Sequence, residues 1–525
     1  MAFPRPEPAT RTRLADLLAA VAGLSDALVL GDESTVVTGV SLDSRGVRQG
    51  DLYAALPGAH AHGASFAAGA VDLGATAVLT DPAGAGIVRA AGLDRPLVVV
   101  DDPRLVLGEV ARAVYGTADL PVRLVGITGT NGKTTTAHLV ACALDALGRR
   151  TGLIGTVEIR IGEERVRSVR TTPEATDLHA LLAVMAARGI DTCVMEVSSH
   201  ALVMHRVDGV VYDLAVFTNL SQDHLDFHPT MRDYFAAKAS LFTPERARRG
   251  IVCVDDAWGR ELAASAAIPV TTLTSHPGVE ADWVVRPDAA DPARFTLSGP
   301  GAELSLRSAL PGEFNRVNTA VAALVLLELG VAAQDAERAV LTDPHVPGRM
   351  ERVRPSVRVA GRDVPTALVD YAHTPEAVAA ALTALRPTTP GPLVVVLGAG
   401  GDRDRGKREA MGRAAAEHAD VVIVTDDNPR SEDPALIRAA VLAGATAAST
   451  ERGVEVLEVG DRAAAIRAAV RAADAGRGAT VAVVGKGHET GQEVAGVVHH
   501  FDDREALRQA LDEVLARPEQ ERRLS

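Results

Sequence analysis

Apolar runs alternate with helical stretches along the middle of the chain. Four of these runs are LVGIT (124–128), TCVMEVSS (192–199), DLAVFTNL (213–220) and GIVCVDD (250–256). Strands that alternate with helices predict crossover connections and a parallel sheet. Each run ends in polar residues, and ligands in open α/β sheets bind beyond the carboxyl ends of the strands. We therefore expect four polar residues to converge near the end of the first run: Glu196, Asn219, Asp223 and His224.

The pattern breaks around residues 347–349, and a second series of the same kind follows. Its apolar runs are TALVDYAH (366–373), PLVVVLGAGGDRD (392–404), VVIVTDDNPR (421–430) and TVAVVGKGHE (480–489). This series predicts a separate doubly wound domain. Its strands also end in charged, glycine-rich segments, so we expect its ligand edge to face the central domain across a cleft.

The first part of the chain predicts a small α/β module. Residues 11–22 have the apolar spacing of a helix, and strand-like runs follow around residues 35–42. We place a hinge at 119–121, because Pro121 ends the preceding pattern and leaves an extended connection. The predicted α/β architecture has three domains: a small α/β domain at 1–119, a central parallel-sheet domain of P-loop ATPase type at 120–348, and a doubly wound, Rossmann-like domain at 349–525.

Composition narrows the class of protein without naming an activity. The chain has 525 residues, of which 47% are hydrophobic and 23% charged, as is typical of globular proteins. A formal net charge of -14 argues against a general nucleic-acid binder, although a few local cations can still hold a small anion. Cys142, Cys193 and Cys253 lie far apart in apolar runs, which favours buried reduced thiols. No apolar run approaches the roughly 18 residues of a membrane span, so we predict a soluble cytoplasmic protein.

The segment LVGITGTNGKTTT (124–136) has the pattern of a phosphate-binding loop. Gly129 and Gly132 allow several backbone N–H groups to face one anion, and the start of the next helix adds a positive dipole end. Lys133 can then reach the β- and γ-phosphates of ATP, and the Thr134 hydroxyl can ligate Mg²⁺. The usual P-loop pattern has its first glycine where this chain has Ile127, so the loop is a shorter relative of that pattern.

Three further residues are candidates for catalysis in the central domain. Glu196 ends an apolar strand, where a carboxylate can hold Mg²⁺ directly or through water. His224 lies in the polar segment NLSQDHLDFH, but a lone histidine is more often structural than a ligand. Lys238 interrupts the apolar helical segment YFAAKASLF. It either extends to solvent or is buried near a metal, where its pKa falls and its neutral amine becomes reactive.

Three strand-end loops of the last domain suggest a pocket for a zwitterion: GGDRD (400–404), DDNPR (426–430) and GKGHE (485–489). Arginines recognise carboxylates through paired hydrogen bonds. Asp427, Asn428 and Glu489 can accept hydrogen bonds from a substrate ammonium group. Each loop alone has the composition of an ordinary surface loop, whereas three at equivalent strand ends favour a binding site.

Ten segments of the chain, in order, resemble motifs of the Mur ligase family: TGTNGKTTT, MEVSSHAL, NLSQDHLDFH, YFAAKASLF, GEFNRVN, PGRME, DYAHTPE, GGDRDRGKR, DDNPR and GKGHET. The resemblance runs nearly from end to end. It implies an enzyme that adds meso-diaminopimelate to UDP-N-acetylmuramoyl-L-alanyl-D-glutamate in cytoplasmic peptidoglycan precursor synthesis. ATP would first convert the D-glutamate side-chain carboxylate to an acyl phosphate, and an amine would then displace phosphate.

The resemblance also implies a role for individual residues. The catalytic set would be Lys133, Glu196, His224 and Lys238, and the ligands of Mg²⁺ would be Thr134, Glu196, His224 and Lys238 as a carbamate. ATP would contact Gly129, Thr130, Asn131, Gly132, Lys133, Thr134, Thr135, Asn315, Arg349 and Asp370. The first domain would bind UDP, and the UDP-muramoyl peptide would contact Leu42, Ser44, Ala59, His60, Ala61, Thr171, Thr172, Ser198 and Arg206. Diaminopimelate would contact Arg403, Asp427, Asn428, Pro429, Arg430, Gly485 and Glu489.

Two positions depart from the family pattern, and several alternatives stay open. Glu376 stands in DYAHTPE where the family usually has Asp, and the segment GAHAHG (58–63) is not a close match to the UDP loop.

The lysine-adding member of the family and the folate polyglutamate ligases are alternative enzymes. Arg430 favours diaminopimelate over lysine, because lysine lacks a second carboxylate. A catalytically inactive, nucleotide-gated binding protein is the alternative from another class, and a nicotinamide dehydrogenase is disfavoured because GAGGDRD lacks the G-x-G-x-x-G spacing. We expect a monomer.

Overall fold

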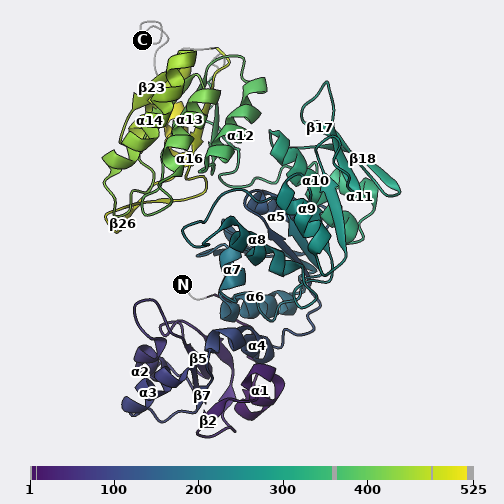
Figure 1. Ribbon diagram of the computed structural model, residues 1–525, viewed down its shortest axis with the longest axis vertical. Coiled ribbons are helices and arrows are strands. Elements are labelled where there is room, and N and C mark those ends of the chain that lie inside the picture. Colours follow the sequence, from purple (N-terminus) through teal and green to yellow (C-terminus); the bar gives the residue numbers. More distant parts are fainter. Residues whose placement is uncertain (1–2, 8, 358–363, 475–476, 517–525) are drawn as a thin grey trace.

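The computed structural model describes residues 3–7, 9–357, 364–474 and 477–516. Three main sheets succeed one another along this part of the chain, each with helices packed against it (Figure 1). The N-terminal sheet and its helices lie at the bottom of the view, the central sheet lies to the right, and the C-terminal sheet lies at the upper left. The chain is therefore an extended arrangement of three α/β units.

The N-terminal sheet has the strand order β2-β7-β6-β5-β4. Its last four strands are parallel, and β2 joins β7 in antiparallel fashion. The strands of this unit are β1 (Thr12–Arg13), β2 (Leu28–Leu30), β3 (Val36–Val37), β4 (Gly39–Ser41), β5 (Asp51–Ala55), β6 (Ala77–Thr80) and β7 (Leu97–Val99). The helices are α1 (Leu14–Ala20), α2 (Ala67–Asp72), α3 (Pro82–Ala90) and α4 (Pro103–Tyr115), with 3-10 turns η1 (Ala22–Leu24) and η2 (Gly63–Phe66).

The central sheet has eleven strands in the order β11-β10-β9-β12-β8-β13-β14-β15-β16-β17-β18. Its strands are β8 (Arg123–Thr128), β9 (Thr151–Ile154), β10 (Glu158–Ile161), β11 (Glu164–Arg167), β12 (Thr192–Glu196), β13 (Leu214–Phe217), β14 (Gly250–Cys253), β15 (Val270–Thr274), β16 (Trp283–Pro287), β17 (Arg294–Gly299) and β18 (Ala302–Arg307). The helices are α5 (Lys133–Ala146), α6 (Ala175–Ala187), α7 (Ser199–Val203), α8 (Met231–Ala239), α9 (Ala257–Ser265), α10 (Glu313–Glu328) and α11 (Ala333–Ala339), with the 3-10 turn η3 (Ser240–Phe242).

The strand that precedes the phosphate loop lies in the middle of the central sheet. β8 has parallel partners on both sides, β12 and β13. Apolar clusters cover both faces of the sheet, and almost the whole of β8 is buried. Strands buried on both faces have continuous apolar sequences, and the run LVGIT is therefore typical of a strand in the middle of a sheet. The loops after β8, β12 and β13 therefore meet at one edge.

The C-terminal sheet has the order β19-β20-β24-β21-β22-β23, with only β19 antiparallel to its neighbour. The strands of this unit are β19 (Glu351–Val353), β20 (Thr366–Asp370), β21 (Leu393–Leu397), β22 (Val421–Val424), β23 (Glu455–Glu458), β24 (Thr480–Val484) and the hairpin β25 (Gly491–Val494) and β26 (Val497–His500). The helices are α12 (Pro375–Leu385), α13 (Lys407–His418), α14 (Pro434–Arg452), α15 (Arg462–Asp474) and α16 (Asp503–Ala516), with the 3-10 turn η4 (Arg386–Thr388).

The predicted α/β fold class is confirmed, with some differences in detail. The central sheet is parallel only in its middle: β9 to β11 and β16 to β18 are antiparallel extensions. All three cysteines are free, but Cys142 is only partly buried, because it lies on the outer side of α5. None of the helices in the described residues is long and apolar enough to cross a membrane. The domain limits 1–119, 120–348 and 349–525 remain our proposal.

Candidate functional site

The phosphate loop is a tight turn between β8 and α5. Gly129 and Gly132 have φ values of 145° and 86°, in the region that favours glycine. A Cβ atom on Gly129 would lie 2.0 Å from the Thr218 hydroxyl, so the neighbouring strand also requires glycine there. Two residues that follow β13 hold the loop in place. The Thr218 hydroxyl donates to the Asn131 carbonyl (2.6 Å), and Asn131 N donates to Asn219 Oδ1 (3.0 Å).

Two lysines donate to the same backbone oxygen in this loop. Lys133 Nζ and Lys238 Nζ each lie 2.9 Å from the Gly129 carbonyl oxygen. Lys238 is 1% exposed, so it is buried and does not extend to solvent. Burial lowers the pKa of both amines, and for Lys238 the charge of Lys133 lowers the pKa further. Two amines at one carbonyl disfavour a positive charge on both, and a nearby anion would stabilise the charge of Lys133.

Glu196 is fully buried at the end of β12 and accepts hydrogen bonds from two threonines. The Thr134 hydroxyl donates to Glu196 Oε2 (2.8 Å), and Thr156 donates through its backbone N–H to Oε1 (2.8 Å) and through its hydroxyl to Oε2 (3.1 Å). A carboxylate buried in this way needs such partners. The geometry ties the strand-end carboxylate directly to the first turn of α5, as the convergence of strand ends predicted.

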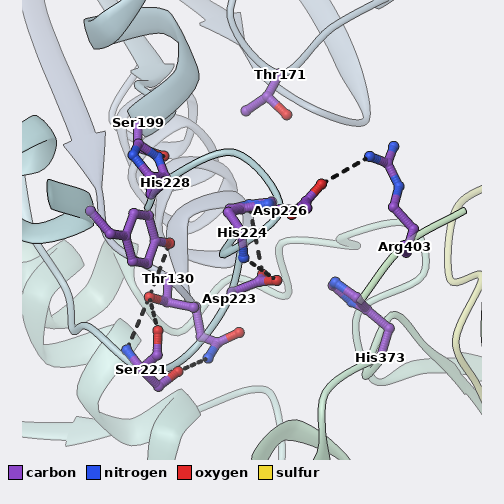
Figure 2. Close-up of polar contacts among 12 residues, drawn as sticks. Thr130, Thr171, Ser199, Ser221, Asp223, His224, Asp226, His228, His373 and Arg403 are labelled. Carbon is purple, nitrogen blue, oxygen red and sulfur yellow. Dashed lines mark hydrogen bonds and ion pairs between the residues drawn. The ribbon is translucent and has the colours of Figure 1, made fainter. Parts of the chain in front are cut away.

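The loop after β13 brings acidic and histidine side chains toward the C-terminal unit (Figure 2). His224 has a φ of 55° and its backbone N–H donates to Asp223 Oδ1 (2.9 Å). Burial lowers the pKa of His224 to about 4. Arg403, from the loop after β21, lies 3.6 Å from Asp226, and Figure 2 shows His373 approaching from the same side. The pair of Arg403 and Asp226 connects the strand-end loops of the C-terminal sheet with those of the central sheet.

Of three further residues predicted for ATP, Arg349 connects the central and C-terminal units, whereas Asn315 and Asp370 each lie within one of them. Arg349 Nη2 donates to the Thr134 hydroxyl (3.3 Å), and its guanidinium lies 4.2 Å above the Tyr371 ring. Asp370 accepts from the backbone N–H groups of residues 350 and 372 at 2.7 and 2.8 Å. Asn315 is buried in the first turn of α10 and donates to the Pro311 carbonyl (2.7 Å). Two threonines of the phosphate loop were also predicted for ATP. The Thr130 hydroxyl forms a hydrogen bond with the Tyr234 hydroxyl (3.2 Å), and the Thr135 side chain is buried.

The loops of the C-terminal sheet hold the residues predicted for the amino acid. Asn428 Nδ2 donates to Glu489 Oε2 (2.8 Å), and Lys486 Nζ donates to Asn428 Oδ1 (2.9 Å) and to Glu489 Oε2 (3.2 Å). Arg430 donates to the Gly401 carbonyl (2.5 Å), while Pro429 packs its carbonyl against that glycine. The Asp427 carboxylate lies over Gly485, whose φ is 115°. Arg403 is the one predicted contact that instead meets the central unit.

The residues predicted for the UDP-muramoyl peptide form two separate groups. Leu42 and Ser44 are partly buried after β4, whereas Ala59, His60 and Ala61 form an exposed loop tip. The second group lies on the central unit: Thr171, Thr172, Ser198 and Arg206. Thr172 donates to the Glu196 carbonyl (2.9 Å), and Ser198 caps α7 by accepting from Ala201 N (3.2 Å). Arg206 lies 2.9 Å from Glu174, which also pairs with Arg104 of α4 (3.2 Å).

Sequence reasoning missed several residues of the site. Thr156 holds Glu196, Tyr234 lies under Lys238, Asp226 meets Arg403, and Lys486 joins Asn428 to Glu489. Three of these residues stand beside assigned residues inside NLSQDHLDFH, YFAAKASLF and GKGHET, and this position is a usable signal: Asp226, Tyr234 and Lys486. Thr156 carries no such signal, because its role depends on β9 lying beside β12.

A phosphate loop on one α/β unit therefore faces charged, glycine-rich loops on another, as suits an ATP-dependent ligase. Three family models match the chain: "Mur ligase family, catalytic domain" at 36–115, "Mur ligase middle domain" at 127–326 and "Mur ligase, glutamate ligase domain" at 348–487. The chain belongs to the Mur ligase family.

Individual relatives agree with this family. The chain is 52% identical over 513 residues to UDP-N-acetylmuramoyl-L-alanyl-D-glutamate--2,6-diaminopimelate ligase of Streptomyces coelicolor, covering 97% of this chain and 98% of the relative. It is 48% identical over 519 residues to the UDP-N-acetylmuramyl-tripeptide synthetase of Leifsonia xyli, with the same coverage. Among solved structures, one of a UDP-N-acetylmuramoyl-L-alanyl-D-glutamate--2,6-diaminopimelate ligase matches with a TM-score of 0.62 and 32% identity. The match covers 92% of this chain and 96% of that one. MurF from Acinetobacter baumannii matches in fold, with a TM-score of 0.66, 19% identity, and coverage of 96% of this chain and all of that one.

Proposed function

We propose that this chain joins meso-diaminopimelate to UDP-N-acetylmuramoyl-L-alanyl-D-glutamate with the use of ATP, in cytoplasmic peptidoglycan precursor synthesis. The name of the Streptomyces coelicolor relative at 52% identity supports this reaction. The proposal is carried by the position of two groups of residues that face each other. On the central unit, Lys133 and the α8 side chain of Lys238 meet at the phosphate loop. On the C-terminal unit, the strand-end loops carry Arg403, Arg430 and Glu489. We expect the enzyme to act as a monomer.

The reaction has two steps with balanced charge and atoms. An oxygen of the glutamate side-chain carboxylate attacks the γ-phosphorus of ATP, the bond to the β–γ bridging oxygen breaks, and ADP leaves. The diaminopimelate amine then attacks the acyl carbon and loses a proton, and inorganic phosphate leaves with the C–O electron pair. Lys133 and the N–H groups of the loop would bind the phosphates, and the enclosed edge would exclude water that hydrolyses the acyl phosphate.

Magnesium fits the donor set around Glu196. Mg²⁺ prefers hard oxygen ligands, which Glu196 and the Thr134 hydroxyl supply at adjacent positions (2.8 Å apart). When bound, Mg²⁺ would neutralise charge on the phosphates. His224 and Lys238 as a carbamate are the other proposed ligands. Within the described residues no three His, Cys, Asp or Glu side chains form a metal-binding group. Oxygens of ATP and of the Lys238 carbamate would supply further ligands.

Carbamylation of Lys238 would replace one of the two amines at the Gly129 carbonyl with an anionic group. The neutral amine that burial favours can attack CO₂, forming an N–C bond and releasing one proton. The product is an anion beside Lys133. We propose this modification because the buried amine lies 4.6 Å from the Tyr234 ring and has no carboxylate partner among the described residues.

The test is ATP-dependent phosphate release with UDP-N-acetylmuramoyl-L-alanyl-D-glutamate, with product mass as confirmation. Meso-diaminopimelate, L-lysine and L-alanine are compared as acceptors, and omission of Mg²⁺ is expected to abolish turnover. Turnover restricted to diaminopimelate supports the proposal. Turnover with lysine keeps the ligase but contradicts the role of Arg430, and a lack of amine-dependent turnover supports the inactive binding protein instead.

A further inference from the structure

The use of lysine in this chain is unusual. Only four of its 54 basic residues are lysines: Lys133, Lys238, Lys407 and Lys486. None of these four is exposed, although lysine is normally a surface residue. Arginine therefore serves almost everywhere that a solvated cation is sufficient. A lysine kept in a buried position of such a chain indicates a place where a compact ammonium group is needed and a planar guanidinium does not fit.

Lys486 is the lysine for which the contacts define a task. Its side chain is 0% exposed, and its Nζ donates to Asn428 Oδ1 (2.9 Å) and Glu489 Oε2 (3.2 Å). Asn428 Nδ2 closes the triangle by donating to the same Glu489 oxygen (2.8 Å). The backbone N–H of Glu493 also donates to Asn428 Oδ1 (3.0 Å). The three side chains thus hold one another in a single arrangement.

The triangle determines which atoms face a ligand. Asn428 Oδ1 is occupied by two donors, so the amide can present only its remaining N–H to a substrate. Glu489 uses Oε2 for the triangle, and Oε1 has no hydrogen-bond partner among the described residues. A substrate therefore meets one donor from Asn428 and one carboxylate oxygen from Glu489. This pair matches the carboxylate and ammonium groups of an amino acid.

The backbone on both sides of Lys486 is packed closely against a neighbouring segment. Gly485 and Gly487 have φ values of 115° and 54°. A Cβ atom on Gly487 would lie 2.8 Å from the Gly348 carbonyl, and one on Gly348 would lie 2.0 Å from His488 N. The turn is thus packed closely against Gly348, at the junction of the central and C-terminal units, and this packing holds the Lys486 backbone in place.

We infer that Lys486 is a positioning residue that sets the acceptor amino acid's binding site by fixing Asn428 and Glu489, without itself touching the substrate. This inference rests on the proposed function, because it assumes that the loops after β22 and β24 hold the amino acid. The buried ammonium also balances the Glu489 charge, so its removal leaves a poorly compensated carboxylate.

The test compares Lys486→Met with the wild-type enzyme in steady-state kinetics. Loss of hydrogen bonds to charged groups is expected to raise the KM for diaminopimelate about 30-fold, with the KM for ATP within about twofold of wild type and kcat affected less than KM. Arg386→Met is the matched control. Arg386 likewise donates hydrogen bonds within the C-terminal unit, to Asp420 and to the carbonyls of Thr389 and Gly391, but it lies at the opposite end of the same sheet. This control is expected to lower thermal stability and leave the KM for diaminopimelate unchanged.

A double variant separates positioning from stability. Glu489→Gln with Lys486→Met buries no unbalanced charge, so it remains measurable if Lys486→Met alone does not fold. If Lys486 acts through Glu489, the double variant should have a KM within about twofold of Glu489→Gln alone. An unchanged KM in Lys486→Met, or independent effects that multiply in the double variant, overturns the inference.

The assay also distinguishes failure of the proposed function. Wild type is first assayed with diaminopimelate and with lysine, and the amino acid it uses becomes the probe. Use of lysine contradicts the proposed acceptor, while the Lys486 comparison proceeds unchanged. If neither is turned over, binding of diaminopimelate is measured by calorimetry, and the absence of binding by wild type overturns both proposals.

Discussion

Two edges of the molecule both lie at the ends of parallel strands but balance charge differently. The phosphate-loop edge contains Lys133 and Lys238, and the proposed amino-acid edge contains Lys486 and Glu489. At the first, Lys133 and Lys238 share one carbonyl oxygen, and neither forms an ion pair within the described residues. At the second, Lys486 pairs with Glu489 (3.2 Å), and the nearby buried Arg462 pairs with Asp503 (2.7 Å). Buried charge without a partner is costly unless a ligand supplies the partner.

The difference indicates what each edge is built to receive. At the phosphate-loop edge, the Lys133 ammonium has no ion-pair partner among the described residues, which suits a polyanion such as the triphosphate of ATP. A balanced pocket suits a zwitterion, which brings both signs and leaves the total unchanged. Variants that alter the charge at one edge should therefore impair one substrate and spare the other.

The largest effect is expected from Lys238→Ala. Removal of the proposed carbamate should reduce kcat about a thousandfold, comparable to the loss of a main electrostatic group at an active site. Added acetate should restore part of the activity by supplying a carboxylate in the space left by the side chain. The measurements are turnover with and without acetate, and ¹³C-NMR of the wild type with labelled bicarbonate.

Arg249→Met is the control for this variant, because Arg249 is an exposed cation of the same unit that pairs with Glu328 (2.9 Å). It should retain wild-type kcat. Full activity of Lys238→Ala, or its indifference to acetate together with no carbamate signal in wild type, would exclude the anionic role of Lys238.

A smaller and more selective effect is expected from Arg430→Ala. Loss of a charged hydrogen bond to the second carboxylate should raise the KM for diaminopimelate about 30-fold. Lysine has no such group, so its turnover should not fall, and the preference for diaminopimelate should narrow. Competition between the two amino acids, followed by product mass, measures this ratio.

Arg452→Ala is the control for Arg430→Ala. Arg452 ends α14 and donates to the Ala416 carbonyl (3.3 Å), so its replacement removes a cation of the same unit away from the pocket. Its acceptor preference should equal that of wild type. An Arg430→Ala enzyme that loses activity equally with both amino acids would contradict a role in selectivity.

The smallest effect is expected from Asp226→Asn, which removes the pair between the two edges. Both side chains are substantially exposed (58% for Arg403 and 41% for Asp226) and 3.6 Å apart, and such pairs contribute little. Release of Arg403 should lower the KM for diaminopimelate by less than about fivefold, because Arg403 then no longer has to leave the Asp226 carboxylate before it binds a substrate carboxylate. Asp291→Asn, at the exposed pair with Arg294, is the control. A raised KM in Asp226→Asn would mean that Asp226 assists binding.

The amino-acid sequence by itself determined the local elements and the chemical character of each edge. The runs that precede Gly129, Glu196 and Asn428 are apolar and short, and their periodicity depends only on neighbouring residues. The glycines of the phosphate loop and of GKGHE carry conformational information in the residue type itself. The family resemblance added the class of reaction, which the family models and relatives confirm.

Only the tertiary structure decided which side chains share a carboxylate or a carbonyl. Sequence spacing left Lys238 open between solvent and burial, and its position beside the Gly129 carbonyl depends on how α8 packs beyond the end of β8. Thr156 reaches Glu196 because β9 is the neighbour of β12, and Lys486 reaches Asn428 because the ends of β22 and β24 converge at one edge. These contacts join residues 40 to 109 positions apart. Strand order and helix packing determine them, and neither is a property of any local segment.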